Sequence, residues 1–358
     1  MINPYLNEGI FILSDQCSFA CDYCYNNWCQ RSEKVMKLQD IKKGIDFLMS
    51  NITPEDENLP GVFFLGGEPL IHFYELIVPA VEYLNTNYPN LKIKKTITTN
   101  AYYLDLEKVK ICKQLGINVN ISFDGPKHVQ NAHRKMKDGS ETFDKVFEHT
   151  QYAIGYGILQ AINSVYCPDT LNNLEETYTF FKSIGVPLWL PHPLIGYNWT
   201  QKQKENFALQ VETICCDYCA TETPDMKVGP LWLENQKKHN TLLFYSNGDV
   251  SYNFPNYFVP PKEYPYLQRL GKIDNDPIFN QEWVETFQSV LKDKMDNKWF
   301  GNMPKEICDT CPIEKDCITP YKTDSKILQE ICRVQDPMEC YQRRLFKIYE
   351  QKYRARIR

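Results

Sequence analysis

Hydrophobic and polar positions follow two alternating periods through roughly the first two hundred residues. Short apolar runs have the length of buried strands, and the longer segments between them repeat apolar residues every 3.6 positions, as amphipathic helices do. The two clearest helical segments are residues 38–51 and 74–88. The predicted strands are residues 9–13, 61–65, 93–99, 117–122, 159–165 and 188–190.

A strand–helix–strand rhythm repeated about six times predicts one parallel sheet with right-handed crossovers. Because a closed barrel of this type needs about eight units, the expected fold class is α/β with a partial (β/α)6 TIM barrel. A polar helical segment follows at residues 200–219, and turns, Pro and aromatic residues dominate beyond it. We therefore place a domain boundary near residue 225, with a barrel at 1–225 and a small cysteine-rich domain at 226–358.

Composition and charge narrow the class of protein. The 358 residues are 43% hydrophobic and 24% charged, as in ordinary globular proteins. The net charge of −5 and the lack of a long basic run before the C-terminal tail argue against nucleic acid as a partner. No stretch approaches the roughly 20 apolar residues of a membrane span, and the N-terminus lacks the plan of a signal peptide. We therefore expect a cytoplasmic protein that does not enter a membrane.

The chain contains fourteen cysteines. In a reducing compartment such as the cytoplasm, clustered thiols are more often metal ligands than disulfides, so the spacing of these cysteines indicates candidate metal sites. Cys17, Cys21 and Cys24 lie on one loop directly after the first predicted strand, at the edge where α/β barrels carry their chemistry. Three thiolates can bind three irons of a [4Fe–4S] cluster and leave the fourth iron open to a chelating ligand. An incomplete zinc site is the alternative, although structural zinc normally takes four ligands in two pairs.

The spacing CxxxCxxC, with Tyr23 before the third cysteine, resembles the motif of the radical S-adenosylmethionine (SAM) superfamily. Three later strands end in segments that follow the order of that superfamily: Leu-Gly-Gly-Glu-Pro at 65–69, Thr-Thr-Asn at 98–100, and Ser-Phe-Asp-Gly-Pro at 122–126 with Arg134 beyond it. Each segment alone would more often be a turn, a strand end or a surface feature. Their common order makes coincidence improbable and implies a radical SAM enzyme.

The resemblance also implies how SAM would be held. Glu68 and the backbone beside it would bind the amino group, and Ser122 and Arg134 the carboxylate, which matches each charge of SAM with its opposite or with a hydrogen-bond donor. The implied cofactor-binding residues are Tyr23, Gly66, Gly67, Glu68, Thr99, Asn100, Ser122, Arg134, Asn163, Ser164 and Leu190. No catalytic acid or base is identified, and the candidates that could face the interior are Asp124, Tyr25 and His192.

A second cysteine group, CxxC-x5-C, comprises Cys308, Cys311 and Cys317, with Cys332 and Cys340 downstream. Three close thiolates and one returning from a later segment can ligate another [4Fe–4S] cluster, and a zinc ribbon is the alternative. The group resembles the SPASM or twitch-like extension of radical SAM enzymes, which normally binds two auxiliary clusters.

This chain departs from that pattern at two positions. Tyr321 and Asn253 stand where the SPASM pattern has cysteines, and both departures fall on the same auxiliary cluster. The resemblance therefore implies an iron–sulfur domain at 226–358 with one auxiliary [4Fe–4S] cluster. Its ligands would be Cys308, Cys311, Cys317 and Cys340, with Cys332 a substitute for the last.

The other cysteines have a simpler interpretation. Cys215, Cys216 and Cys219 share the polar helical segment and are expected to be structural, although one of them could approach a cluster or the substrate. Cys29, Cys112 and Cys167 are expected to be buried thiols.

The resemblance implies reductive cleavage of SAM to a 5′-deoxyadenosyl radical that abstracts hydrogen from a substrate. SPASM-type enzymes mostly act on peptides, and the loss of one auxiliary site departs from the sulfatase-maturating pattern. The favoured hypothesis is therefore maturation of a ribosomally made peptide (a RiPP) by a thioether or carbon–carbon crosslink. The alternatives are an anaerobic sulfatase-maturating enzyme that forms formylglycine, a radical SAM enzyme with a small-molecule substrate, and a non-catalytic iron–sulfur or zinc binding module.

Three kinds of partner follow from this hypothesis: a peptide substrate, an electron donor such as flavodoxin or ferredoxin, and a leader-binding protein. Sixteen residues before Cys17 are too few for an N-terminal leader-binding domain. A leader peptide would therefore need a separate protein or an edge strand of the barrel.

Overall fold

The computed structural model describes residues 6–24, 34–51, 59–194, 197–232, 240–252, 269–275, 278–282, 285 and 337–357. Several predicted positions lie outside the described residues: Tyr25, Cys29, Asn253, Cys308, Cys311, Cys317, Tyr321 and Cys332. Cys340 lies within a described helix, where its backbone alone is placed.

One curved sheet of ten strands organises the described residues, in the order β10-β9-β8-β1-β2-β3-β4-β5-β6-β7. The strands from β8 to β7 pair in parallel, and β9 and β10 add an antiparallel edge. The strands are β1 (Leu6–Ile12), β2 (Gly61–Leu65), β3 (Lys94–Thr99), β4 (Asn118–Ser122), β5 (Leu159–Tyr166), β6 (Leu188–Pro193), β7 (Lys227–Val228), β8 (Asn240–Tyr245), β9 (Asp249–Tyr252) and β10 (Arg269–Lys272).

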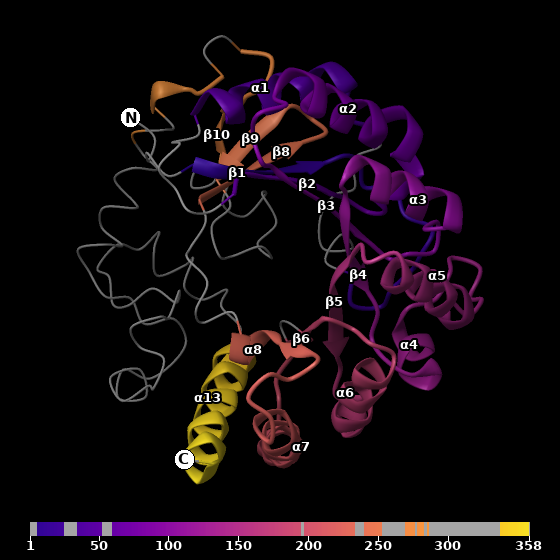
Figure 1. Ribbon diagram of the computed structural model, residues 1–358, viewed down its shortest axis with the longest axis vertical. Helices are drawn as coiled ribbons and strands as arrows, with labels where there is room; N and C mark the ends of the chain where they lie inside the picture. Colours follow the sequence, from indigo (N-terminus) through magenta and orange to yellow (C-terminus); the bar gives the residue numbers. More distant parts are fainter. Residues whose placement is uncertain are drawn as a thin grey trace.

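The helices that connect the parallel strands lie along the outer side of this arc (Figure 1). They are α1 (Leu38–Asn51), α2 (Val78–Asn87), α3 (Leu106–Leu115), α4 (Lys127–His133), α5 (Phe143–Gly155), α6 (Leu174–Ser183) and α7 (Gln201–Cys219). The short α8 (Gly229–Trp232) and the final α13 (Pro337–Ile357) complete the set. An open parallel sheet with its helices on one side is the predicted partial barrel, so the predicted fold class is confirmed.

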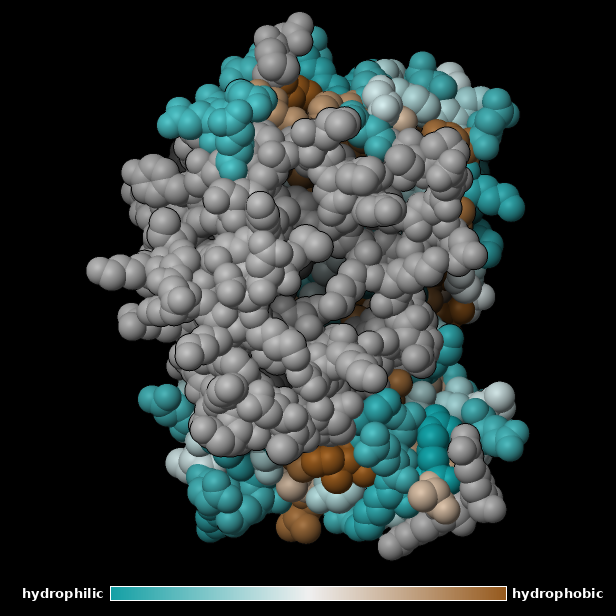
Figure 2. All heavy atoms as spheres, turned by 90° about the vertical axis from the view of Figure 1, so that its left-hand side faces the viewer, coloured by the Kyte–Doolittle hydropathy of each residue, from teal (hydrophilic) through white to brown (hydrophobic). Residues whose placement is uncertain are grey.

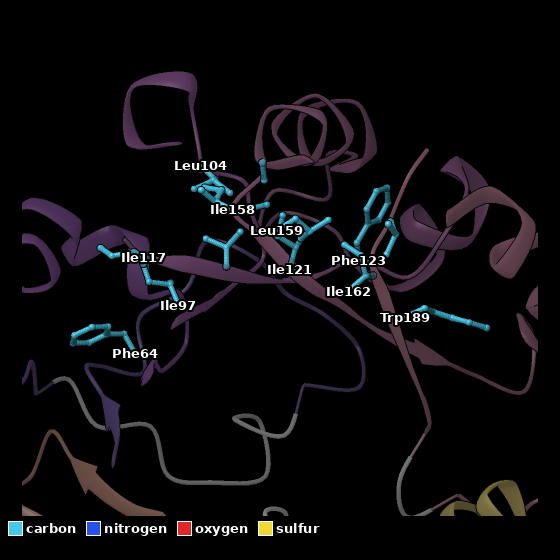
Figure 3. Packing of buried hydrophobic residues seen from close by; sticks show 14 of the residues in the cluster. Phe64, Ile97, Leu104, Ile117, Ile121, Phe123, Ile158, Leu159, Ile162 and Trp189 are labelled. Carbon is cyan, nitrogen blue, oxygen red and sulfur yellow. The ribbon is translucent and has the colours of Figure 1, made fainter. Parts of the chain in front are cut away.

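The two faces of the sheet differ in burial, which follows from the period of two in each strand. Residues on the outer face, such as Ile97, Ile121 and Ile162, are fully buried under the helices (Figure 3). Their neighbours on the inner face, such as Ser122 and Asn163, are partly exposed. Burial of the outer face supplies the hydrophobic stabilisation, while the inner face keeps polar side chains available for chemistry.

Local signals explain where several helices begin and end. Asp105 caps α3, since its Oδ1 accepts from the Lys108 backbone at 2.9 Å, and Gly116 ends that helix at a φ of 70°. Thr200 and Gln203 form a capping box at the start of α7, which matches the predicted helical segment closely. The predicted helix at 74–88 instead opens with a π turn at Phe73–Ile77 before α2.

The region assigned to the second domain contributes to the same sheet. β8 pairs in parallel with β1 from Leu6 to Ile12, and the β8–β9 hairpin turns at Gly248, whose φ is 86°. At the other end of the sheet, α13 packs against α7 and α8 (Figure 1). The chain therefore returns after residue 225 to both ends of the barrel sheet.

On the face of the molecule that Figure 2 shows, the described residues are mainly hydrophilic. Figure 2 shows hydrophilic residues at both ends of one face, with smaller hydrophobic patches among them. Among the described helices, none combines the length and the apolar composition that crossing a bilayer requires.

Candidate active site

The loop that carries Cys17, Cys21 and Cys24 follows β1 at the carboxyl edge of the sheet. On one side it is hydrogen-bonded to the turn after β2. The Gly67 backbone N–H donates to Ser14 O at 2.8 Å, and the Glu68 N–H donates to Gln16 O at 2.7 Å. These two bonds align the turn at 66–68 with the first half of the cysteine loop.

Gly66 and Gly67 are required by this close approach of two backbones. A Cβ atom at Gly66 would lie 2.4 Å from Ser14 O, and the φ of 145° at this position also favours glycine. A Cβ atom at Gly67 would lie 2.4 Å from Gln16 O and 2.7 Å from Asp15 O. In this structure both glycines let the cysteine loop pass over the β2 turn.

Gly67→Ala should therefore displace the cysteine loop. The new methyl group meets backbone atoms that cannot rotate away, so we expect a loss of at least about 1–3 kcal/mol in the free energy of unfolding. Urea denaturation of the metal-free protein would measure that loss. Gly155→Ala is the matched control, since a Cβ atom there meets nothing within 4 Å. Equal stability of the two variants would contradict the packing argument.

The other side of the loop is bonded to the segment after α4. The Ala20 N–H donates to Lys135 O at 2.8 Å, and the Lys137 N–H donates to Ser18 O at 3.0 Å. Phe19 forms an antiparallel bridge with Met136 between these bonds. The cysteine loop is thus held between two backbone segments, one from each side, which limits its freedom to rearrange.

The three cysteines on this loop are present as thiols rather than disulfides. Cys17 Sγ accepts from the Phe19 N–H at 3.4 Å and lies 3.7 Å from Asn100 Nδ2, a potential donor at the end of β3. Burial raises the pKa of Cys17 and raises that of Cys21 to about 12. A cluster needs thiolates, so its binding would release these protons. Three thiols on one restrained loop fit a cluster with three protein ligands.

Glu68 connects the ends of β2 and β3. Its Oε1 accepts from Thr99 Oγ1 at 2.6 Å and from the Leu70 N–H at 3.0 Å, and its Oε2 accepts from the Asn100 N–H at 2.8 Å. The residue is fully buried, and this burial raises the pKa of Glu68 to about 7 although all three hydrogen bonds act to lower it. Thr99 and Asn100, both predicted SAM contacts, are therefore held in place by Glu68.

Because the pKa of Glu68 is raised, the free energy of unfolding should depend on pH, and the sign of this dependence is defined. Between its ordinary pKa of 4.5 and about 7, the folded protein holds the proton more tightly than the unfolded chain does. Stability should therefore fall as pH rises through this window, by roughly 3 kcal/mol in total. Urea denaturation of the metal-free protein at about pH 5 and about pH 8 would show this slope, and Glu68→Gln should reduce it. If Glu68→Gln left the slope of stability against pH unchanged, Glu68 would not be the source of that slope.

Asp124 occupies the centre of a buried polar group behind the cysteine loop. Its Oδ1 lies 3.0 Å from Arg134 Nε and accepts from the Val165 N–H at 2.9 Å, while its Oδ2 accepts from the Tyr23 hydroxyl. Burial raises the pKa of Tyr23 well above its ordinary value. Burial also acts to lower the pKa of Arg134, but the charge of Asp124 outweighs it and the pKa is raised. Asp124 and Arg134 thus form a buried ion pair.

The sequence does not indicate this role for Asp124, which it offers only as a candidate acid or base. The Asp124 backbone N–H donates to Gln130 Oε1 at 2.9 Å, and Gln130 is fully buried one turn before Arg134. The sequence feature that could have indicated this role is the placement of Gln130 and Arg134 one turn apart on the same helical segment. Asp124 thereby joins the cysteine loop, the end of β4 and the segment after α4.

Three predicted SAM contacts form one row across neighbouring strands. Ser122 pairs with Asn163, and Asn163 pairs with Leu190, so the three lie side by side on the partly exposed inner face. His192 lies two residues further along β6, on the same face.

Ser164, also a predicted contact, lies on the opposite face of β5. It is 3% exposed, and its Oγ accepts from the Trp189 indole N–H at 2.7 Å. Trp189 belongs to the core between the sheet and the helices (Figure 3). Adjacent strand residues face opposite sides, which separates Asn163 from Ser164.

The remaining described cysteines are mostly core residues. Cys112, Cys167, Cys215 and Cys219 are buried, whereas Cys216 is exposed. Cys215 Sγ lies 3.8 Å from the carbonyl oxygen of Phe346, its hydrogen-bond acceptor at the contact of α7 with α13. Cys215 and Cys219 thus have the burial expected of structural cysteines, whereas the exposed Cys216 does not.

Comparisons with known proteins point to one family. Residues 11–181 match the radical SAM superfamily. An uncharacterized protein of Methanocaldococcus jannaschii is 31% identical over 49% of this chain, and a cysteine-type anaerobic sulfatase-maturating enzyme of Clostridium perfringens is 26% identical over 58%. These matches span 59% and 56% of the two relatives, little more than half of their lengths.

Solved structures share the fold over a larger part of the chain. The structure of anSMEcpe with bound AdoMet is 19% identical with a TM-score of 0.74, and the match covers 98% of each chain. Streptococcus suis SuiB bound to the precursor peptide SuiA is 15% identical with a TM-score of 0.60, covering 91% of this chain and 76% of SuiB. At these identities the two structures establish the shared fold. Residues 11–181, which carry the three-cysteine loop at the carboxyl edge of the sheet, are therefore the part of the chain that is similar to the radical SAM superfamily.

Proposed function

We propose that this protein binds a [4Fe–4S] cluster through Cys17, Cys21 and Cys24, cleaves SAM, and modifies a ribosomally made peptide by hydrogen abstraction. The observation that carries the proposal is the restrained loop, which presents three thiols between the β2 turn and the segment after α4. When bound, the cluster and SAM would supply a 5′-deoxyadenosyl radical, chemistry that protein side chains do not provide.

The residues of the chain would orient SAM and keep water away from it. Ser122, Asn163 and Leu190 offer a hydroxyl, an amide and an apolar side chain in one row on the inner face. Arg134 carries five N–H donors, so Asp124 and the carboxylate of SAM would share its guanidinium. Holding the substrate carbon beside the reactive carbon is how such a site would contribute most to the rate.

A peptide substrate is supported by the relatives, since SuiB was solved with a precursor peptide and the Clostridium enzyme is named for sulfatase maturation. Crosslinking of a ribosomal peptide is supported by Tyr321 and Asn253, which replace two cysteines of the SPASM pattern. The product would then be a thioether or a carbon–carbon bond.

Formylglycine formation is the second candidate. The observation in its favour is the fold of anSMEcpe, which covers 98% of this chain. The two functions require the same barrel and differ in what the substrate loses. A crosslink removes two hydrogens, whereas a cysteine converted to formylglycine loses its thiol group and one carbon-bound hydrogen and gains an aldehyde oxygen from water.

One auxiliary [4Fe–4S] cluster, with Cys308, Cys311, Cys317 and Cys340 as ligands, is part of the proposal. Its support comes from α13, whose first turn contains Cys340. Gln342 is 5% exposed, its Nε2 donates to Pro191 O at 2.8 Å, and its Oε1 accepts from the Tyr166 hydroxyl at 2.5 Å. These bonds hold the start of α13 at the ends of β5 and β6, on the edge that carries the first loop. A cluster there could take an electron from the product radical.

The test uses anaerobically reconstituted protein with dithionite, or with flavodoxin or ferredoxin as the electron donor. We expect conversion of SAM to 5′-deoxyadenosine and about eight irons and eight sulfides per chain for two clusters. About twelve of each would contradict the single auxiliary cluster. A binding module would release no 5′-deoxyadenosine.

Two substrate arms separate the candidate functions by mass spectrometry. One arm uses a short peptide with a repeated Cys or aromatic motif, and the other uses a cysteine-containing sulfatase peptide. Loss of two hydrogens from the first supports crosslinking. Aldehyde formation on the second would establish sulfatase maturation instead.

A further inference from the structure

A second group of metal-ligating side chains lies behind the cysteine loop. His133 ends α4, and Cys167 and Asp169 lie on the turn after β5. Each offers one ligand atom, and these nitrogen, sulfur and oxygen atoms all lie within 4.8 Å of one another. The proposed SAM chemistry uses none of the three.

The His133 ring lies between two carboxylates. Its Nε2 lies 3.0 Å from Asp169 Oδ1, and its Nδ1 lies 3.2 Å from Asp22 Oδ2 on the cysteine loop. Metal-binding histidines commonly use one ring nitrogen for the ion and donate the other N–H to a carboxylate, which fixes the tautomer and the ring orientation. Asp22 occupies the place of that carboxylate.

Cys167 and Asp169 are held on one turn. The Cys167 N–H donates to Thr170 Oγ1 at 2.9 Å, and the Thr170 N–H donates to Cys167 O at 3.1 Å and lies 3.1 Å from Asp169 Oδ1. Cys167 is 2% exposed, whereas the Asp169 side chain is 65% exposed. The thiol therefore comes from the protein side of the group and the carboxylate from the solvent side.

We propose that His133, Cys167 and Asp169 bind one divalent transition-metal ion of the zinc class. The set of one nitrogen, one sulfur and one oxygen suits tetrahedral zinc and does not suit magnesium or calcium, which prefer oxygen ligands throughout. Tetrahedral zinc holds its ligand atoms about 3.5 Å apart. His133 Nε2 and Asp169 Oδ1, at 3.0 Å, already lie within that separation, whereas atoms of the group that are up to 4.8 Å apart need to approach by about 1 Å. Water would take the fourth position.

The ion would join the cysteine loop to the end of β5. Asp22 lies between Cys21 and Cys24, and its contact with His133 transmits the position of the ion to the loop. Tyr23 adds a second contact, with its ring centroid 5.8 Å from that of His133. The bound ion would thus stabilise the conformation of the cysteine loop that holds the first cluster. Without an ion, the His133 ring would join the two carboxylates directly.

The test adds Co²⁺, a spectroscopic substitute for Zn²⁺, to reconstituted holoprotein whose cluster ligands are already occupied. We expect one equivalent to give a difference spectrum with a thiolate-to-cobalt band and tetrahedral d–d bands, both removed by added Zn²⁺. Cys167→Ser should abolish the thiolate band. Asp169→Asn, at an exposed side chain, should weaken binding at least about tenfold without affecting the fold.

Cys216→Ser is the control for adventitious binding, because it removes the exposed thiol on α7. Cys112→Ser is the control for loss of a buried thiol elsewhere. A thiolate band that persists in Cys167→Ser, or Co²⁺ affinity unchanged in Asp169→Asn, would overturn the proposal. So would the absence of a thiolate band in the unmodified protein, which would leave His133 as a bridge between carboxylates alone.

Discussion

Cys24→Ala should abolish the formation of 5′-deoxyadenosine. Two thiolates cannot hold a cluster that the loop binds with three, so the iron content of the reconstituted protein should fall by about four per chain. Cys24 is partly exposed, and its removal leaves the backbone bonds of the loop in place. The measurement is chromatographic detection of 5′-deoxyadenosine from SAM under dithionite, together with iron analysis.

Cys112→Ala is the matched control for this result. Cys112 is a fully buried thiol on α3, so its loss tests the general effect of removing a cysteine. We expect the control to keep both its iron and its activity. Production of 5′-deoxyadenosine by the Cys24 variant would refute the assignment of the first loop.

Asp124→Asn should destabilise the fold more than any surface substitution. Asp124 and Arg134 are 2% and 8% exposed, and the variant leaves the guanidinium buried without its counter-charge. Breaking a buried pair from one side typically costs about 3–5 kcal/mol. Urea denaturation of the metal-free protein would measure that loss in the free energy of unfolding.

Asp144→Asn provides the comparison at an exposed ion pair. Asp144 Oδ2 lies 2.7 Å from Lys127 Nζ with 75% of its side chain exposed, and such pairs contribute roughly 0–1 kcal/mol. The two variants also separate two roles for Asp124. An Asp124→Asn protein that is inactive but as stable as the Asp144→Asn control would favour a catalytic role over the ion pair.

The fold was largely predictable because its main signals are local. The predicted strand at 61–65 coincides with β2, and the predicted helix at 38–51 coincides with α1. Both segments carry enough apolar residues at one period to define their type. The three cysteines and the Gly-Gly-Glu-Pro turn were recognisable for the same reason, since each motif is contiguous in the chain.

Features that depend on distant contacts were not predictable. No local signal pairs β8 with β1, whose residues are more than two hundred positions apart in the chain. Gln342 resembles any polar helix residue, and only the folded chain brings it to Pro191. Asn163 and Ser164 show the same difficulty on one strand. Both were predicted as SAM contacts, but which of them faces the interior of the barrel is defined only once β5 is placed in the sheet.

The pairing of β1 with β8 has a consequence for synthesis on the ribosome. While residues 1–225 emerge, the hydrogen-bonding groups on one edge of β1 have no partner strand, and exposed strand edges invite association between chains. The barrel can complete this edge only after Tyr245 has left the exit tunnel. The cysteine loop begins where β1 ends, so the strand that carries the loop gains its second partner late in synthesis. Until then, nascent chains need protection from associating with one another through the open edge of β1.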